Sequence, residues 1–207
     1  MTILRFIKGI ISVLKRNYEE SKYDSSNIAE KFRKAGAKIG ENCFLQMSDL
    51  ASEPYLVEIG NNVAIAAGVS LITHDGASVI FRDEFPYLRF YGKIIIEDNC
   101  FIGRGSVICA GVRIGKNSIV GPMSVVIRDV KPGSVVIGNP AIQVSTVDKY
   151  RERCLKEWNK LKLDRFKELF EGMDKYEVQK VIESEKFSNM LKEHFLSMDN
   201  SKSIQEW

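Results

Sequence analysis

Hydrophobic and polar residues follow a period of six over a long stretch of the chain, from Gly92 to Pro140. An aliphatic residue recurs at every sixth position, and a small or β-branched residue follows most of these four places later. The aliphatic positions are Ile96, Ile102, Ile108, Ile114, Val120 and Val126. This spacing fits neither the period of two of a half-buried strand nor the period of 3.6 of an amphipathic helix. A six-residue repeat with one inward aliphatic position is typical of a parallel β-helix, so the pattern predicts a mainly β solenoid.

The repeat extends towards the N-terminus but is broken twice. It starts near Ile39, runs out of frame over residues 48–58, and lapses again after His74 in a stretch with five aromatic residues. We therefore expect a β-helix domain at 37–145 that carries an inserted loop at 75–92. A loop this long and this apolar usually has a function or contacts another subunit.

Both ends of the chain show helical periodicity instead. Residues 3–16 place their aliphatic side chains on one stripe. They predict a helix that packs on the protein or on a partner subunit, or else a basic amphipathic helix on an anionic membrane surface. A short helix before Gly36 completes an N-terminal helical segment at 1–36. Residues 146–207 predict a C-terminal appendage of several short helices, one of which ends at Gly172.

Composition narrows the classes of function. The net charge is only +3, and no basic cluster is interleaved with aromatic residues, so a nucleic-acid partner is not expected. The four cysteines form no C-x-x-C pair, which predicts reduced thiols in a cytoplasmic protein and no metal site. No apolar run reaches the roughly 18 residues of a membrane span, and no signal-peptide cleavage site follows the N-terminal stretch. We expect a cytoplasmic protein, held at the inner face of the membrane if residues 3–16 bind lipid.

The two histidines of the chain have different surroundings. His194 lies in a helical pattern near the C-terminus, where a surface or packing role is expected. His74 lies at a predicted coil corner, at the mouth of the inserted loop, so a regular solenoid would hold it rigidly. The sequence contains no G-x-S-x-G elbow, P-loop, H-E-x-x-H motif or dinucleotide-binding glycine motif that would indicate another kind of catalytic site. His74 is therefore the main candidate for a catalytic group.

Three phrases of the repeat resemble a known family. They are L-I-T-H-D-G, F-I-G-R-G-S-V-I-C-A-G-V-R-I-G and S-V-V-I-R-D-V-K-P-G-S-V-V-I-G-N-P-A. Over about residues 36–145 the chain resembles the hexapeptide-repeat acyltransferases. It is most similar to the sugar O-acetyltransferases of bacterial polysaccharide and nodulation-factor synthesis and to the maltose, galactoside and xenobiotic acetyltransferases. The resemblance implies a left-handed parallel β-helix, a homotrimer with active sites between subunits, and acetyl-coenzyme A (acetyl-CoA) as donor.

The resemblance also implies that His74 is the general base. A free imidazole titrates at about pH 6.5, so it can take the proton of a sugar hydroxyl while that oxygen attacks a thioester. The residue after His74 is Asp75, and either this carboxylate or a backbone carbonyl is expected to orient the ring. Backbone amides around Gly103, Arg104 and Gly105 are candidates for stabilising the oxyanion.

In this family the donor lies in a groove between the coils of neighbouring subunits. The matching positions for its pantetheine arm, with the corner at Gly103 and Arg104, are Ser106, Ala110, Gly111, Gly121 and Ser124. The matching cations for its phosphates are Lys116, Arg128 and Lys131. The aromatic residues of the inserted loop are Phe81, Phe85, Tyr87, Phe90 and Tyr91, and they would contact either the sugar or a neighbouring subunit.

Three alternatives remain open at this stage. The enzyme would acetylate the amine of an amino sugar if acidic groups such as Asp75 or Glu84 lie beside His74. The β-helix would be a non-catalytic assembly scaffold if it binds no coenzyme A. It would be a peripheral membrane enzyme acting on a lipid-linked glycan if residues 3–16 bind a bilayer.

Overall fold

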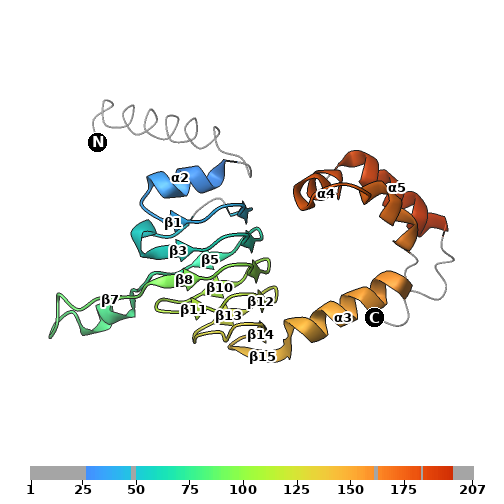
Figure 1. Ribbon diagram of the computed structural model, residues 1–207. Coiled ribbons are helices and arrows are strands. Elements are labelled where there is room, and N and C mark those ends of the chain that lie inside the picture. The colour runs from blue at the N-terminus through green and yellow to red at the C-terminus, as the bar shows by residue number, and fades with distance from the viewer. Residues whose placement is uncertain (1–26, 48–49, 161–162, 183, 198–207) are drawn as a thin grey trace, which may run out of the picture. The chain divides into compact units, whose positions relative to one another are not determined.

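The computed structural model describes residues 27–47, 50–160, 163–182 and 184–197 (Figure 1). The helix predicted for residues 3–16 lies outside these ranges. The chain divides into two compact units, Met1–Glu152 and Arg153–Trp207, and each is described by itself.

Short strands follow one another along three sheets of the first unit. The first sheet holds β1 (Lys38–Ile39), β3 (Val57–Ile59), β8 (Ile94–Ile96) and β11 (Arg113–Ile114). The second holds β2 (Phe44–Leu45), β4 (Ala64–Ile65), β9 (Phe101–Ile102), β12 (Ile119–Val120), β14 (Ser134–Gly138) and β15 (Ala141–Thr146). The third holds β5 (Ser70–Leu71), β10 (Val107–Ile108) and β13 (Val125–Val126). Neighbouring strands are parallel except for the final β14–β15 pair, so the predicted parallel β-helix is confirmed (Figure 1).

The six-residue period corresponds to stacked aliphatic side chains inside the coil. In the second sheet Ile65, Ile102 and Val120 lie in register on successive coils, and all three are fully buried. Stacking like residues in a close-packed interior explains why the period is strict in this region. The N-terminal end of the stack is covered by α2 (Ile28–Lys34), which buries Ile28 and Phe32.

Residues 50–56 of the out-of-frame segment form no strand on the side of the first coil that leads to the third sheet. Leu50 still points into the core, and a 3-10 turn, η1 (Pro54–Leu56), leads into β3. The coil that contains this segment is two residues longer than a regular coil. Lys38 pairs with Glu58, 20 positions further along, whereas Phe101 pairs with Ile119.

Charged side chains line the outer face of the first sheet. Glu58 lies between Lys38 and Lys93, at 2.8 and 2.6 Å, and Glu97 lies 2.8 Å from Arg113. Hydrogen bonds from Lys38 and then Lys93 hold the pKa of Glu58 below its usual value of 4.5. The pKa of Glu97 is also lowered, mainly by the hydrogen bond from the backbone N–H of Lys116 and secondly by the one from the Arg113 side chain.

These lowered pKa values predict how stability depends on pH. Because the folded pKa of Glu58 and Glu97 is below 4.5, their contribution is fully present above pH 4.5 and is lost as the pH falls through the folded values. We expect the urea concentration at the midpoint of unfolding to decrease as the pH is lowered past about 4.5 in the wild type. This decrease should be smaller in the double variant E58Q/E97Q. Equal pH dependence in the two proteins would contradict this assignment.

The second unit contains short helices that pack around two phenylalanines. Its elements are α3 (Val147–Lys160), which begins in the first unit, η3 (Leu163–Phe170), α4 (Lys175–Ile182) and α5 (Glu185–Ser197). Phe166 and Phe187 are buried, with ring centroids 5.8 Å apart. The predicted helical character of this region is confirmed, although the stretch after position 163 is a 3-10 helix. Within the described ranges, no helix combines the length and apolarity that crossing a bilayer requires.

Candidate active site

The chain leaves the coil after β5 and returns to it at the same corner. The backbone N–H of Gly92 donates to the carbonyl of Thr73, at 2.9 Å, so the two ends of the insertion lie side by side. Within it, β6 (His74–Asp75) pairs with β7 (Phe90–Tyr91), and η2 (Ala77–Phe81) forms part of the loop that projects from the stack (Figure 1). His74 is therefore held at its base by the solenoid and by a two-stranded ribbon.

A carboxylate that the sequence did not indicate orients His74. The Nδ1 atom of His74 lies 2.9 Å from Oε2 of Glu53, in the out-of-frame segment. Only 16% of the Glu53 side chain is exposed, against 40% for His74. An ionised carboxylate only accepts hydrogen bonds, so Nδ1 carries a proton and donates. In the neutral ring the lone pair is then on Nε2, which can accept a proton.

Glu53 is kept ionised by its neighbours. The hydroxyl of Thr73 donates to the same Oε2 atom at 2.6 Å. This hydrogen bond, followed by the one from His74, holds the pKa of Glu53 below its usual value of 4.5. At neutral pH the pair is therefore a carboxylate and a histidine, the arrangement that fixes a tautomer and stabilises an imidazolium.

The expected partner of His74 was Asp75 or a backbone carbonyl, and the structure has neither. Oδ1 of Asp75 instead accepts the backbone N–H of Ala77 at 2.7 Å, so Asp75 stabilises the turn that starts the insertion. The offset between coils could have indicated Glu53. Thr73 and Glu53 are 20 residues apart, the offset that also separates the paired Lys38 and Glu58.

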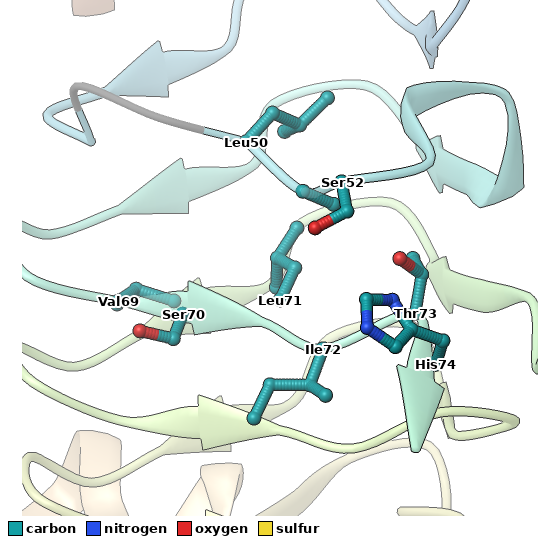
Figure 2. Close-up of a pocket in the computed structure, with 9 residues that line it drawn as sticks. Leu50, Ser52, Val69, Ser70, Leu71, Ile72, Thr73 and His74 are labelled. Carbon is teal, nitrogen blue, oxygen red and sulfur yellow. The ribbon is translucent and has the colours of Figure 1, made fainter. Parts of the chain in front are cut away.

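A cavity of about 250 Å³ opens beside His74 (Figure 2). Its wall is formed by two stretches, one just before Glu53 and one along β5 up to His74. The lining residues are Leu50, Ala51, Ser52, Val69, Ser70, Leu71, Ile72, Thr73 and His74. Among the described residues that line this cavity, only His74 has a side chain that can carry a charge. The arrangement can therefore hold a small neutral molecule next to a proton acceptor.

The expected donor-binding residues are distributed over three corners of one chain. Ala110, Gly111 and Arg128 lie at the corner between the third and first sheets, below His74, and we call this the His74 corner. The corner between the second and third sheets holds Gly103, Arg104, Ser106, Gly121 and Ser124. The corner between the first and second sheets holds Lys116 and Lys131. A single chain therefore does not bring these residues together.

Some of the expected contact groups are already used inside the coil. The hydroxyls of Ser106 and Ser124 are fully buried and donate to the carbonyl of Gly121, at 2.9 and 2.7 Å. Their side chains therefore cannot contact a donor. The amides of Gly103 and Gly105 donate to backbone carbonyls of neighbouring coils and lie at a different corner from His74. They are not oxyanion donors for the His74 of their own chain.

Comparison with known proteins identifies the family. A family model described as "Bacterial transferase hexapeptide (six repeats)" matches residues 93–128. Protein CapG of Staphylococcus aureus is 38% identical over 151 residues, an alignment that covers 72% of this chain and 83% of CapG. This chain belongs to the hexapeptide-repeat transferase family. It is an acyltransferase, and its solenoid is the left-handed parallel β-helix of that family.

Two further proteins are similar to this chain over most of their length. The galactoside O-acetyltransferase of Lactococcus lactis is 26% identical over 160 residues, covering 66% of this chain and 76% of that enzyme. The crystal structure of a hexapeptide-repeat-containing acetyltransferase from Vibrio cholerae superimposes with a TM-score of 0.51 at 24% identity, over 68% of this chain and 92% of that one. The second comparison shows a common fold.

In the described part of this chain, no group of three His, Cys, Asp or Glu residues could hold a metal ion.

Proposed function

We propose that this protein transfers the acetyl group of acetyl-CoA to a hydroxyl of a sugar or polysaccharide precursor. The observation that carries the proposal is the Glu53–His74 pair, which leaves Nε2 as a proton acceptor beside a small neutral cavity. The family relationship supports an acyl transfer. The name of the relative from Lactococcus lactis, a galactoside O-acetyltransferase, supports a sugar hydroxyl as acceptor.

The chemistry requires one base and no covalent enzyme intermediate. Nε2 of His74 removes the hydroxyl proton as the sugar oxygen attacks the thioester carbonyl in a ternary complex. Glu53 stabilises the imidazolium that results, because its ionised Oε2 accepts the Nδ1 proton. The imidazolium then returns its proton to the departing thiolate, which restores the neutral ring.

The cavity favours a neutral acceptor over an amine or an acid. Its volume of about 250 Å³ is below the range of roughly 300–1,000 Å³ that holds drug-sized ligands, so it suits a single sugar ring. The carboxylate of Glu53 accepts the hydrogen bonds of Thr73 and His74 on Oε2, and Glu53 is not among the residues that line the cavity, so it does not face an ammonium group there. N-acetylation of an amino sugar is therefore the second candidate.

Assembly as a homotrimer would gather the donor-binding corners. The outer face of the second sheet is apolar, and its residues lie in register on successive coils: Phe44, Ala64, Phe101 and Ile119. Phe101 is 46% exposed. Packing between copies would cover such a face and would place the His74 corner of one copy next to a different corner of its neighbour. We place this assembly in the cytoplasm, with residues 3–16 as a contact either for a neighbour or for the membrane.

Acceptor-dependent release of coenzyme A tests the function. We expect thiol release from acetyl-CoA with neutral glycosides, and a kcat/KM at least about tenfold lower with matched 2-amino or uronic acid glycosides, because the described residues of the cavity wall include no charged side chain besides His74. Ile72→Asp, at a cavity residue that is 43% exposed, should weaken the neutral acceptor. Val144→Asp, at a residue that is 55% exposed and does not line the cavity, is the matched control.

Two results would contradict the proposal in different ways. Faster release with amino sugars would favour N-acetylation. No release with any acceptor, together with no binding of coenzyme A by calorimetry, would favour the scaffold.

A further inference from the structure

Thr73 differs from three other buried hydroxyls of the solenoid. Ser106 and Ser124 donate to the carbonyl of Gly121, and Ser118 donates to the carbonyl of Lys131, so these serines hold backbone corners together. Thr73 is 1% exposed and donates to a side chain instead, the carboxylate of Glu53. Its hydroxyl is therefore used at the active site rather than in a corner.

The fold itself does not require a hydroxyl at this position. Leu71 pairs with Ile108, and Ile108 pairs with Val126, so the positions two residues later on successive coils are Thr73, Ala110 and Arg128. An alanine and an arginine occupy the equivalent corners of the next two coils. A threonine hydroxyl is thus specific to the coil that carries His74.

We propose that Thr73 is a positioning residue, whose buried hydroxyl fixes Oε2 of Glu53 where it must lie to orient the imidazole of His74. This inference rests on the proposed function, because it assigns a role in the same reaction. Two donors converge on one oxygen: the Thr73 hydroxyl at 2.6 Å and His74 Nδ1 at 2.9 Å.

The physical basis is the freedom of the glutamate side chain. Glu53 approaches His74 from an irregular segment that forms no strand, so the sheet ladder does not fix its position. A hydrogen bond to a charged group is stronger than one between neutral groups, and a nearly buried hydroxyl must find an acceptor. Without the hydroxyl, Glu53 can rotate away, and the imidazole then loses both its orientation and its fixed tautomer.

A double-mutant cycle separates this role from a structural one. We expect Thr73→Val to lower kcat about tenfold with little change in the KM for acetyl-CoA, and Thr73→Ser to keep most of the activity because it retains the hydroxyl. In the Glu53→Ala background, Thr73→Val should cost nothing further, because Thr73 acts only through Glu53. If valine is not accommodated, Thr73→Ala removes the same hydroxyl with a smaller side chain.

Ser118→Ala is the matched control, since it removes another fully buried hydroxyl far from His74 in the fold. It should lower the melting temperature without a change in kcat. Equal losses for Thr73→Val with and without Glu53, or no loss at all, would overturn the proposal.

A second measurement does not depend on turnover. In protein labelled with ¹⁵N-histidine, the Nδ1–H that donates to Glu53 should give a low-field proton resonance, which His74→Ala assigns because the chain has two histidines. We expect Thr73→Val to broaden or shift this resonance, and Thr73→Ser to preserve it. An unchanged resonance in Thr73→Val would overturn the positioning role even in an active enzyme. If the wild type shows no transferase activity and Thr73→Val still loses the resonance, the positioning role of Thr73 is supported and the proposed reaction is refuted.

Discussion

His74→Ala is expected to lower acceptor-dependent release of coenzyme A by at least about a hundredfold, because general base catalysis typically contributes that much or more. The loss should appear in kcat, since the imidazole accepts the proton in the transition state and does not contribute to substrate binding in the ground state. Stopped-time thiol assays at saturating acetyl-CoA measure it directly. The affinity for coenzyme A, measured by calorimetry, should change little.

The chain contains its own control for this experiment. His194 lies in α5 of the second unit, outside the solenoid, and His194→Ala should leave kcat within about twofold of the wild type. A loss of less than fivefold in His74→Ala with donor binding intact would show that another group removes the proton. Equal losses in both variants would indicate a general effect on folding.

Gly103→Ala is expected to destabilise the solenoid strongly. An added Cβ would lie 2.6 Å from the backbone nitrogen of Pro122 and 2.8 Å from both the carbonyl carbon of Gly121 and the carbonyl oxygen of Val120. All three are backbone atoms of the next coil, so no side chain can rotate away to relieve the contact. Overpacking of this kind costs about 1–3 kcal/mol and more when the backbone must move, so we expect at least about 3 kcal/mol in urea unfolding.

Gly76→Ala provides the comparison. The added Cβ would meet no atom within 4 Å, and the backbone φ of −82° suits any residue. Its unfolding free energy should stay within about 0.5 kcal/mol of the wild type. Similar losses of unfolding free energy in Gly103→Ala and Gly76→Ala would contradict the close approach of the next coil at Gly103.

Periodicity predicted the inside and outside of the solenoid correctly, because each side chain's direction depends only on its place in the six-residue unit. The stacked Ile65, Ile102 and Val120 are one example. The same rule also explains the burial of Ser106 and Ser124, which lie at the small inward position. The resemblance to the family had placed both serines among the positions that contact the donor, and the burial of their side chains leaves only their backbone for such a contact.

Glu53 could not be found in this way, because it lies where the period fails. Contact between Glu53 and His74 depends on the length of the irregular coil, and the 20-residue offset that would indicate it follows from the pairing of β1 with β3 rather than from the six-residue repeat. The contact between Glu53 and His74 therefore depends on a segment without a repeat, whereas the fold depends on a local six-residue repeat. The position of His74 was predictable for the opposite reason, since it follows directly on a regular strand.

The hydrogen bond between Gly92 and Thr73 also bears on how this enzyme can diversify. Because the insertion leaves and re-enters at one point, its length and sequence do not change the register of any coil above or below it. The exposed aromatic loop can be exchanged for another while the base and its carboxylate stay in place. New contacts with an acceptor or with a neighbouring subunit can then arise by replacing one side branch, without any selection on the stacked core.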